Sequence, residues 1–254
     1  MALHGIQSHG GWYQYSCTRL AAAGYEVFFL DRRGSGLNWR QRGHVIHGER
    51  VLADVRQFLR QLAWERRAHS PAPPILMGVS WGGKLATACA ATLESEISGL
   101  ALLYPGLYSR VRPSWWQRWQ LGWASAVGWG QVATPIPLND PRYFTDSRAW
   151  QEYIRRDELA LQHVTVDFMR ANIWLSQLIE ERAGDIHGPV LMMLAGQDEM
   201  IDNVANRNYL RRLKNATTLL KEYPQARHTL EFEPNPDEFI DDLVTWLNEV
   251  SVHT

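Results

Sequence analysis

A serine set between glycines is the residue of this sequence best placed to do chemistry. Ser80 lies in the run Gly78–Gly82, which matches the pattern G-x-S-x-G. An apolar, strand-like run at 75–79 leads into it, and an alanine-rich, helix-like stretch follows it. A strained turn from strand to helix exposes the serine hydroxyl, and glycines keep Cβ atoms out of the crowded bend. The motif therefore predicts that Ser80 attacks a carbonyl carbon as a nucleophile.

Two further residues could activate this serine. A serine hydroxyl needs a general base, and the base needs a carboxylate that orients it. With this motif the acid and then the histidine follow the serine in the chain, each after a strand. Asp198 follows the apolar run 190–194, and His228 lies in the loop after the run 217–220. We therefore predict a catalytic triad of these two residues with Ser80. Less suitably placed candidates are Asp202, His163, His187 and His253.

Backbone N–H groups should stabilise the oxyanion that such an attack creates. One donor should be the N–H of Trp81, because it directly follows the nucleophile at the start of a helix. The second should come from a loop after an earlier strand, and the glycine-rich segment Leu3–Gly11 fits that description. Within this segment we expect Ile6 N–H to be the donor, although an ordinary glycine-rich turn has the same composition.

The elements that must position these residues alternate between strand and helix. Continuous apolar runs indicate strands that are buried on both faces of a parallel sheet. They occur at 27–30, 75–79, 100–104, 190–194 and 217–220. Helix-like stretches lie between them and after the last one, at 13–23, 48–68, 82–93, 204–212 and 236–250. The pattern predicts an α/β fold with a mostly parallel, doubly wound sheet.

The alternation stops once, between residues 105 and 188. This stretch holds no convincing buried strand, and we interpret it as a helical, tryptophan-rich cap over a core of residues 1–104 and 189–254. Four tryptophans in it have nearly one-face helical spacing: Trp115, Trp116, Trp119 and Trp123. They either line an apolar substrate pocket above Ser80 or simply pack on the core. A basic membrane-surface helix is a weaker interpretation, although arginines lie nearby at Arg110, Arg112 and Arg118.

Composition narrows the class of protein. The 254 residues include 26 Lys and Arg against 27 Asp and Glu, so no basic field predicts nucleic acid as a partner. We find no apolar stretch of about 18 residues and no secretory signal, and we expect a cytoplasmic protein without a transmembrane segment. Cys17 and Cys89 are too few for a cysteine-based zinc site, and no histidine spacing matches a metal motif. We therefore expect no metal and no cofactor.

The sequence resembles the α/β-hydrolase superfamily, and within it the monoacylglycerol lipase and lysophospholipase branch, which is similar to the serine aminopeptidases of family S33. The matching stretches cover most of the chain outside the expected cap: His4-Gly5 with His9 and Tyr13, then 22–27, 31–36, 78–83, 196–198 and His228. The resemblance implies hydrolysis of lipid-like or other apolar acyl esters through an acyl-enzyme. It also implies a small-molecule ester as the partner, and a substrate-binding role for His9.

Three features depart from that branch. Ser8 stands where an acidic residue usually precedes His9, and Trp12 replaces an arginine. Two antiparallel strands usually precede the His-Gly loop, and here that loop comes almost at once. The strand at 27–30 should then lie at an exposed sheet edge, which is a template for pairing with another chain. We expect either self-association through this edge or a lone segment that covers it.

Two other functions remain open. A peptidase or amidase would use the same triad, and acidic residues such as Asp157 and Glu158 could hold the α-amino group of its substrate. A catalytically silent ligand-binding protein could share the fold, although no triad position is substituted in this sequence. Labelling by a fluorophosphonate probe would separate an active serine hydrolase from the silent protein.

Overall fold

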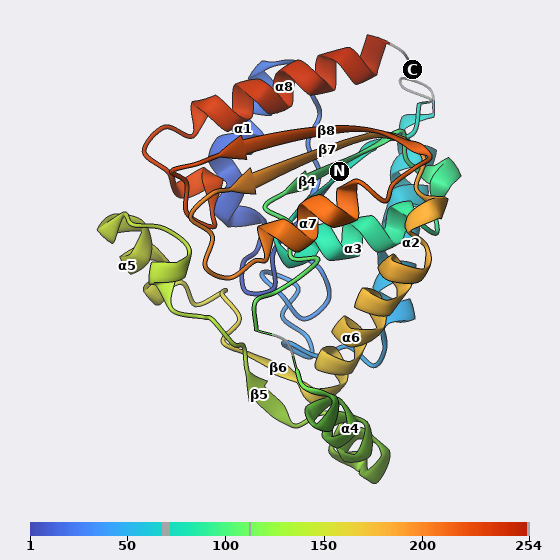
Figure 1. Cartoon of the computed structure of the whole chain (residues 1–254), viewed down its shortest axis with the longest axis vertical. Coiled ribbons are helices and arrows are strands. Elements are labelled where there is room, and N and C mark those ends of the chain that lie inside the picture. The colour runs from blue at the N-terminus through green and yellow to red at the C-terminus, as the bar shows by residue number, and fades with distance from the viewer. Residues whose placement is uncertain (68–71, 112, 253–254) are drawn as a thin grey trace.

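A parallel sheet forms the centre of the molecule in the computed structural model, which describes residues 1–67, 72–111 and 113–252. The strand order is β2-β1-β3-β4-β7-β8, and each neighbouring pair is parallel (Figure 1). The strands are β1 (Ala2–Leu3), β2 (Phe29–Leu30), β3 (Ile75–Val79), β4 (Gly99–Leu103), β7 (Gly188–Ala195) and β8 (Ala216–Tyr223). The predicted α/β fold with a mostly parallel sheet is confirmed.

Helices cover both faces of this sheet (Figure 1). On one face lie α1 (Gln14–Ala22) and α8 (Asp237–Val252). On the other lie α2 (Gly48–Arg66), α3 (Trp81–Ala90), α6 (Val166–Glu181) and α7 (Asn203–Leu210). Side chains along each strand alternate between the two layers, because successive residues of a strand point to opposite faces. The apolar runs seen in the sequence therefore supply both hydrophobic cores.

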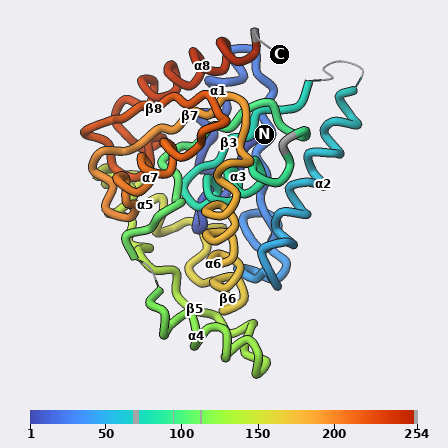
Figure 2. Tube along the Cα trace, turned by 45° about the vertical axis from the view of Figure 1, so that its right-hand side comes forward, coloured from blue at the N-terminus to red at the C-terminus, as the bar shows by residue number. Residues whose placement is uncertain are grey.

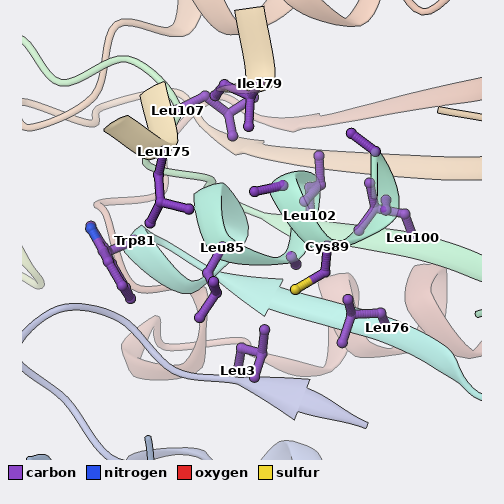
Figure 3. Packing of buried hydrophobic residues seen from close by; sticks show 14 of the residues in the cluster. Leu3, Leu76, Trp81, Leu85, Cys89, Leu100, Leu102, Leu107, Leu175 and Ile179 are labelled. Atoms are coloured by element: carbon purple, nitrogen blue, oxygen red, sulfur yellow. The ribbon is translucent and has the colours of Figure 1, made fainter. Parts of the chain in front are cut away.

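Helix α3 lies deepest, and all ten of its residues are buried. Figure 3 shows Leu85 and Cys89 of this helix packed between sheet residues and side chains of α6 such as Leu175. Small residues dominate α3, since it must fit between two layers at close-packed density. This packing fixes the first turn of α3, where the chain leaves Ser80.

The segment between β4 and β7 is more structured than the sequence suggested. It contains α4 (Trp115–Ala124), a π-helical turn (Ser125–Trp129), β5 (Ala133–Pro135), α5 (Arg148–Arg156), β6 (His163–Thr165) and α6. Strands β5 and β6 pair antiparallel, whereas we expected no convincing buried strand here. Both strands have only three residues, and β5 ends in a proline, so they carry too little apolar pattern to be recognised from the sequence. The division of the chain into a core and a cap at residues 105 and 188 stays a prediction. Helix α6, which belongs to this segment, packs against α2 and α3.

Short helical turns complete the connections. The 3₁₀ turns are Gly10–Tyr13, Glu94–Glu96, Pro141–Tyr143, Ala183–Asp185 and Leu230–Phe232. Elements α4, β5 and β6 lie at the end of the molecule farthest from α8, in both views (Figures 1 and 2). No helix among the described residues combines the length and the apolar character needed to cross a bilayer. The predicted helix end at Ala68 lies outside the described residues.

The N-terminal part of the sheet contains two very short strands, β1 and β2. Two residues, Ala2 and Leu3, suffice to form β1, which lies between β2 and β3. Strand β2 is one of the two edges of the sheet, as the position of the run at 27–30 suggested, and its ladder is only two residues long. The ring of Phe29 stacks on Tyr13 with centroids 4.8 Å apart, which covers one side of this edge. Self-association through it stays a prediction.

Candidate functional site

Ser80 occupies a strained backbone turn between β3 and α3. Its φ of 51° and ψ of −121° lie outside the regions that residues with a side chain prefer. Such strain persists only where the surroundings hold it in place, and it is typical of active sites. Here the helix lies directly against the strand, because a Cβ on Gly78 would come within 2.6 Å of the Gly83 Cα. The glycines of the motif are therefore required by packing.

The structure brings Ser80, His228 and Asp198 together from three different strand ends. His228 Nε2 lies 2.8 Å from Ser80 Oγ, and His228 Nδ1 lies 2.6 Å from Asp198 Oδ2. The carboxylate accepts a hydrogen bond from Nδ1–H, so in the neutral ring the unprotonated Nε2 can accept the serine proton. Both His228 and Asp198 are buried. The arrangement can activate the hydroxyl and keep its base away from bulk water.

The neighbours of Asp198 and His228 fix their orientation. Asp198 Oδ1 accepts backbone N–H groups from Met200 at 2.8 Å and Ile201 at 3.0 Å. The His228 ring packs edge-on against Tyr104 and Phe144, with centroids 5.1 and 5.8 Å apart. Burial raises the pKa of the Tyr104 phenol well above its ordinary value, so this ring stays neutral beside the imidazole. The base is held by hydrogen bonds on one side and by packing on the other.

The loop that carries Ile6 passes close to the nucleophile. A Cβ on Gly5 would lie 3.4 Å from Ser80 Cβ and 3.1 Å from Ser8 Oγ, so only glycine fits here without a shift. Trp81 is the first residue of α3, and the first N–H groups of a helix have no partner within it. The loop that carries Ile6 and the first turn of α3 therefore both border Ser80, and the role of Ile6 N–H and Trp81 N–H as oxyanion donors stays a prediction.

We interpreted Asp31, Arg32 and Arg33 from the sequence as a turn fixed by local ion pairing, yet the Arg32 side chain reaches this loop from the turn after β2. The guanidinium is buried and donates to the carbonyl oxygens of Gly5, over 3.1 Å, and Ile6. It also lies 4.9 Å above the ring of Trp81. Burial lowers its pKa to about 9, so it remains charged at neutral pH. The only sequence signal was the stretch 31–36, which does not indicate where an arginine side chain goes.

A narrow pocket of about 50 Å³ opens beside Ser80. Its lining includes Ile6, Gln7, Tyr104 and His228, and residues of the β4–β7 segment also contribute: Ile136, Leu138 and Phe144. The pocket is mostly apolar, which suits an acyl group. The side-chain amide of Gln7 is buried, and within the described part of the chain neither its oxygen nor its nitrogen has a hydrogen-bond partner. That amide is an unused polar group at the edge of the pocket.

The predicted substrate-binding tryptophans do not lie at this pocket. Trp115, Trp116, Trp119 and Trp123 are exposed on α4, and none of them is among the pocket-lining residues. Helical spacing shows that side chains share a face, but it does not show what that face contacts. His9 is also absent from the lining. Its ring is buried, and Nε2 hydrogen-bonds to Asp157 Oδ2 at 3.0 Å.

Comparisons with known proteins identify the family of this chain. A sequence model of the family described as serine aminopeptidase, S33, matches residues 1–235. The chain is 27% identical over 249 residues to the monoacylglycerol lipase of Mycolicibacterium smegmatis, covering 96% of this chain and 85% of that protein. Solved structures share the fold. The monoacylglycerol lipase of Paleococcus ferrophilus matches with a TM-score of 0.85 at 24% identity, over 98% of this chain and 93% of that one.

A second solved structure extends the likeness to a ligand-bound protein. It is a soluble variant of the Saccharomyces cerevisiae monoglyceride lipase in complex with a substrate analogue. Its TM-score is 0.83 at 20% identity, over 98% of this chain and 85% of that one. Since the family model covers far more than half of the residues, the chain belongs to the serine aminopeptidase S33 family: it is an α/β-hydrolase, similar along nearly its whole length to carboxylic-ester hydrolases of the monoacylglycerol lipase type.

Proposed function

We propose that this chain hydrolyses carboxylic esters with an apolar acyl group, through an acyl-enzyme formed on Ser80. The observation that carries the proposal is the unbroken hydrogen-bonded series from Ser80 through His228 to Asp198, with distances of 2.8 and 2.6 Å. Nucleophile, base and orienting acid are all within direct hydrogen-bond reach, as this chemistry requires.

Each step follows from these three side chains. Ser80 Oγ forms a bond to the ester carbonyl carbon while His228 Nε2 takes the hydroxyl proton, and Asp198 stabilises the imidazolium. The carbon–oxygen bond to the alcohol then breaks, and the alcohol leaves with the proton from His228. A water molecule next attacks the acyl-enzyme, gives a proton to His228, and releases the carboxylic acid. Ser80 regains its hydroxyl proton at the end of the cycle.

Ile6 N–H and Trp81 N–H are the proposed donors to the oxyanion. Trp81 is held by the buried helix α3 to which it belongs. Ile6 is held by its loop, whose Gly5 carbonyl accepts a hydrogen bond from Arg32. Preorganised donors stabilise developing charge without reorganising, and the loss of one typically costs on the order of 10²–10³ in rate. Their proposed positions on either side of Ser80 match that requirement.

The substrate class follows from the pocket and the relatives. Side chains from the segment we propose as a cap, including Ile136 and Phe144, form one wall of the pocket. The named relatives are lipases for monoacylglycerols, which supports lipid-type esters as substrates. At about 50 Å³ the pocket is far smaller than the roughly 300 Å³ of the smallest typical ligand sites. A long acyl chain therefore requires this wall to move.

A peptidase using the same triad is less well supported. Its predicted anchor for an α-amino group, Asp157, already accepts hydrogen bonds from His9, Trp12 and Leu159. Glu158 is exposed and contributes nothing to the pocket. A silent binding protein is disfavoured by the triad geometry itself.

Fluorophosphonate labelling and ester turnover test the proposal together. The wild-type protein should be labelled at one serine and should hydrolyse a chain-length series of p-nitrophenyl esters, with an aminoacyl anilide run beside it. Ser80→Ala should abolish labelling and turnover. Ser176→Ala is the matched control, because that hydroxyl on α6 donates only to the Asn172 carbonyl. Preferred cleavage of the anilide would favour the peptidase, and an unlabelled wild-type protein would favour the silent binder.

A further inference from the structure

Arg32 places a buried positive charge next to the loop that borders the nucleophile. Its side chain donates hydrogen bonds to the hydroxyl of Ser35 and to the backbone carbonyl oxygens of Gly5 and Ile6. All of these acceptors are uncharged. No carboxylate in the described part of the chain forms an ion pair with the guanidinium, and its buried Nε has no hydrogen-bond partner there either. The charge is therefore balanced only by dipoles.

The carboxylate that precedes Arg32 in the chain is engaged elsewhere. Asp31 accepts the backbone N–H groups of Gly10, over 2.8 Å, and of Leu37, over 2.9 Å. Burial lowers the pKa of Arg32 to about 9, although the charge of Asp31 opposes this, so the guanidinium stays charged at neutral pH. A buried charge without an ionic partner costs free energy that an apolar side chain of similar size would not cost. Packing alone therefore does not account for an arginine at this position.

The carbonyl oxygen of Gly5 is bound both by Arg32 and by a histidine that Arg32 orients. It accepts hydrogen bonds from Arg32 Nη2 at 3.1 Å and from His4 Nδ1 at 2.8 Å. The backbone N–H of Arg32 donates to His4 Nε2 over 3.2 Å, so the ring proton lies on Nδ1. Burial and the nearby Arg32 hold the pKa of His4 well below its ordinary value, which keeps this ring neutral.

Aromatic rings border the guanidinium on the side of helix α3. Its Cζ atom lies 4.9 Å from the ring centroid of Trp81 and 5.4 Å from that of Phe168. The indole of Trp81 is fixed in turn, because its Nε1 donates to Asn172 Oδ1 over 2.9 Å. Trp81 is the first residue of α3 (Figure 3). Arg32 thus contacts residues of both backbone segments that border the nucleophile.

The turn after β2 holds the guanidinium in one place before any substrate binds. The backbone N–H of Ser35 donates to the Arg32 carbonyl oxygen over 3.1 Å, and the Ser35 hydroxyl accepts a hydrogen bond from Nη1. Ser35 is itself buried. An arginine side chain held by these contacts does not have to reorganise when charge develops nearby, which is the condition for effective electrostatic stabilisation.

We infer that Arg32 is a positioning residue that strengthens the oxyanion site at Ser80, an inference that rests on the proposed function. A hydrogen bond to a peptide carbonyl polarises the whole amide, so the N–H at its other end becomes a better donor. In the peptide bond that begins at Gly5, this N–H belongs to Ile6. The positive charge also creates a field that favours negative charge on the substrate oxygen.

The effect should be larger in the transition state than in the bound substrate. An ester is uncharged when it binds, and its carbonyl oxygen becomes negative only as Ser80 Oγ bonds to the carbon. An interaction that favours only the charged state raises kcat without tightening substrate binding. Arg32→Gln should therefore lower kcat on the order of 10²-fold, the range seen for lost oxyanion stabilisation, with KM close to that of the wild-type protein.

A trifluoromethyl ketone with an apolar chain measures the stabilisation of the oxyanion directly. Ser80 Oγ adds to the ketone carbon, the serine proton passes to His228, and the ketone oxygen becomes an oxyanion. Fluorine NMR of this adduct against pH gives the pKa at which that oxygen takes up a proton. Arg32→Gln should raise this adduct pKa by about one to two pH units, because a nearby positive charge favours the ionised form. The inhibition constant of the ketone should rise on the order of 10²-fold.

Three controls separate the charge of Arg32 from support of the loop. The amide analogue of the ketone stays uncharged, so its affinity should not change in Arg32→Gln. Arg32→Lys keeps the charge but not the planar fork that binds two carbonyls, so its adduct pKa should lie between those of the wild type and Arg32→Gln. Arg33→Gln is the matched control and should behave like the wild type, because the neighbouring guanidinium pairs with Asp54 on α2.

The outcomes distinguish this inference from the proposed function. If the wild-type protein neither cleaves esters nor forms the adduct, the proposed function is wrong and the inference fails with it. If the wild type does both and Arg32→Gln leaves the adduct pKa unchanged, only the inference is wrong. Equal weakening of the ketone and the amide would also overturn it, since that result indicates support of the loop alone. Should Arg32→Gln not fold, Arg32→Lys decides: a raised adduct pKa supports the inference, and the wild-type value overturns it.

Discussion

His9 Nε2 lies 3.0 Å from Asp157 Oδ2, and this pair joins the loop beside Ser80 to the segment between β4 and β7. Gly11 N–H donates to His9 Nδ1 over 3.1 Å, so the ring proton lies on Nε2 and points to the carboxylate. Trp12 Nε1 donates to the same oxygen over 2.5 Å. Both members of the pair are only 8% exposed, so water competes little for these bonds.

Loss of this carboxylate should loosen the loop. Asp157→Ala leaves two buried donors without a partner, which should lower the free energy of unfolding by about 2 kcal/mol. Because the loop also carries Ile6, kcat for ester hydrolysis should fall about tenfold. Denaturant unfolding and steady-state kinetics measure both effects. The neighbouring exposed residue gives the control, Glu158→Ala, which should match the wild-type protein. Similar losses in both variants would argue against the pair as a specific link.

Ester hydrolysis should depend on a neutral imidazole at His228. The rate should rise with pH as this ring loses its proton, because only the neutral form accepts the Ser80 proton. His228→Ala should lower kcat on the order of 10⁴-fold or more. His163→Ala on β6 serves as the control, since this exposed ring lies outside the pocket. Wild-type rates and an unchanged pH profile in His228→Ala would mean that another group is the base.

Replacing Gln7 by leucine should make the fold more stable and should also test whether its amide recognises the alcohol part of the substrate. A buried polar group without a partner costs about 1–3 kcal/mol, so Gln7→Leu should raise the free energy of unfolding. If the Gln7 amide binds hydroxyl groups of the alcohol part of the substrate, Gln7→Leu should lower kcat/KM for a glycerol ester about tenfold. The methyl ester of the same acid should be little affected. An equal change for both esters would remove Gln7 from alcohol recognition.

Glu231 should make the protein less stable as the pH rises. Burial raises the pKa of this carboxyl, although Ser16 N–H donates to it over 3.0 Å. The folded state therefore holds its proton to higher pH than the unfolded state. Stability from this group is present below the unfolded pKa of about 4.5 and falls as the pH rises through the folded pKa. Glu231→Gln should remove that decline, measured as unfolding free energy against pH, whereas the exposed control Glu238→Gln should retain it.

Most of the sheet and the triad could be predicted because they leave local marks. The apolar run at β3 has the bounds Ile75–Val79, as expected, and Asp198 and His228 follow their strands as the motif requires. Contacts made over long sequence distances leave no such mark. Arg32 reaches the Gly5 carbonyl from the turn after β2, and nothing in its own neighbourhood indicates this. The surroundings of the tryptophans on α4 could not be predicted either, because helical spacing does not show what a helix face contacts.

Strand β8 is the last strand in the chain, and this sets the order in which the protein can become active. Its loop supplies His228, which must meet Ser80 across a separation of 148 residues. Closure of such a long loop is slow compared with local folding. A chain still emerging from the ribosome, with β3 and α3 already formed, would hold its nucleophile without a base. During refolding, the recovery of fluorophosphonate labelling should therefore report when β8 and the loop that carries His228 have formed. This recovery should lag behind the return of the helical signal.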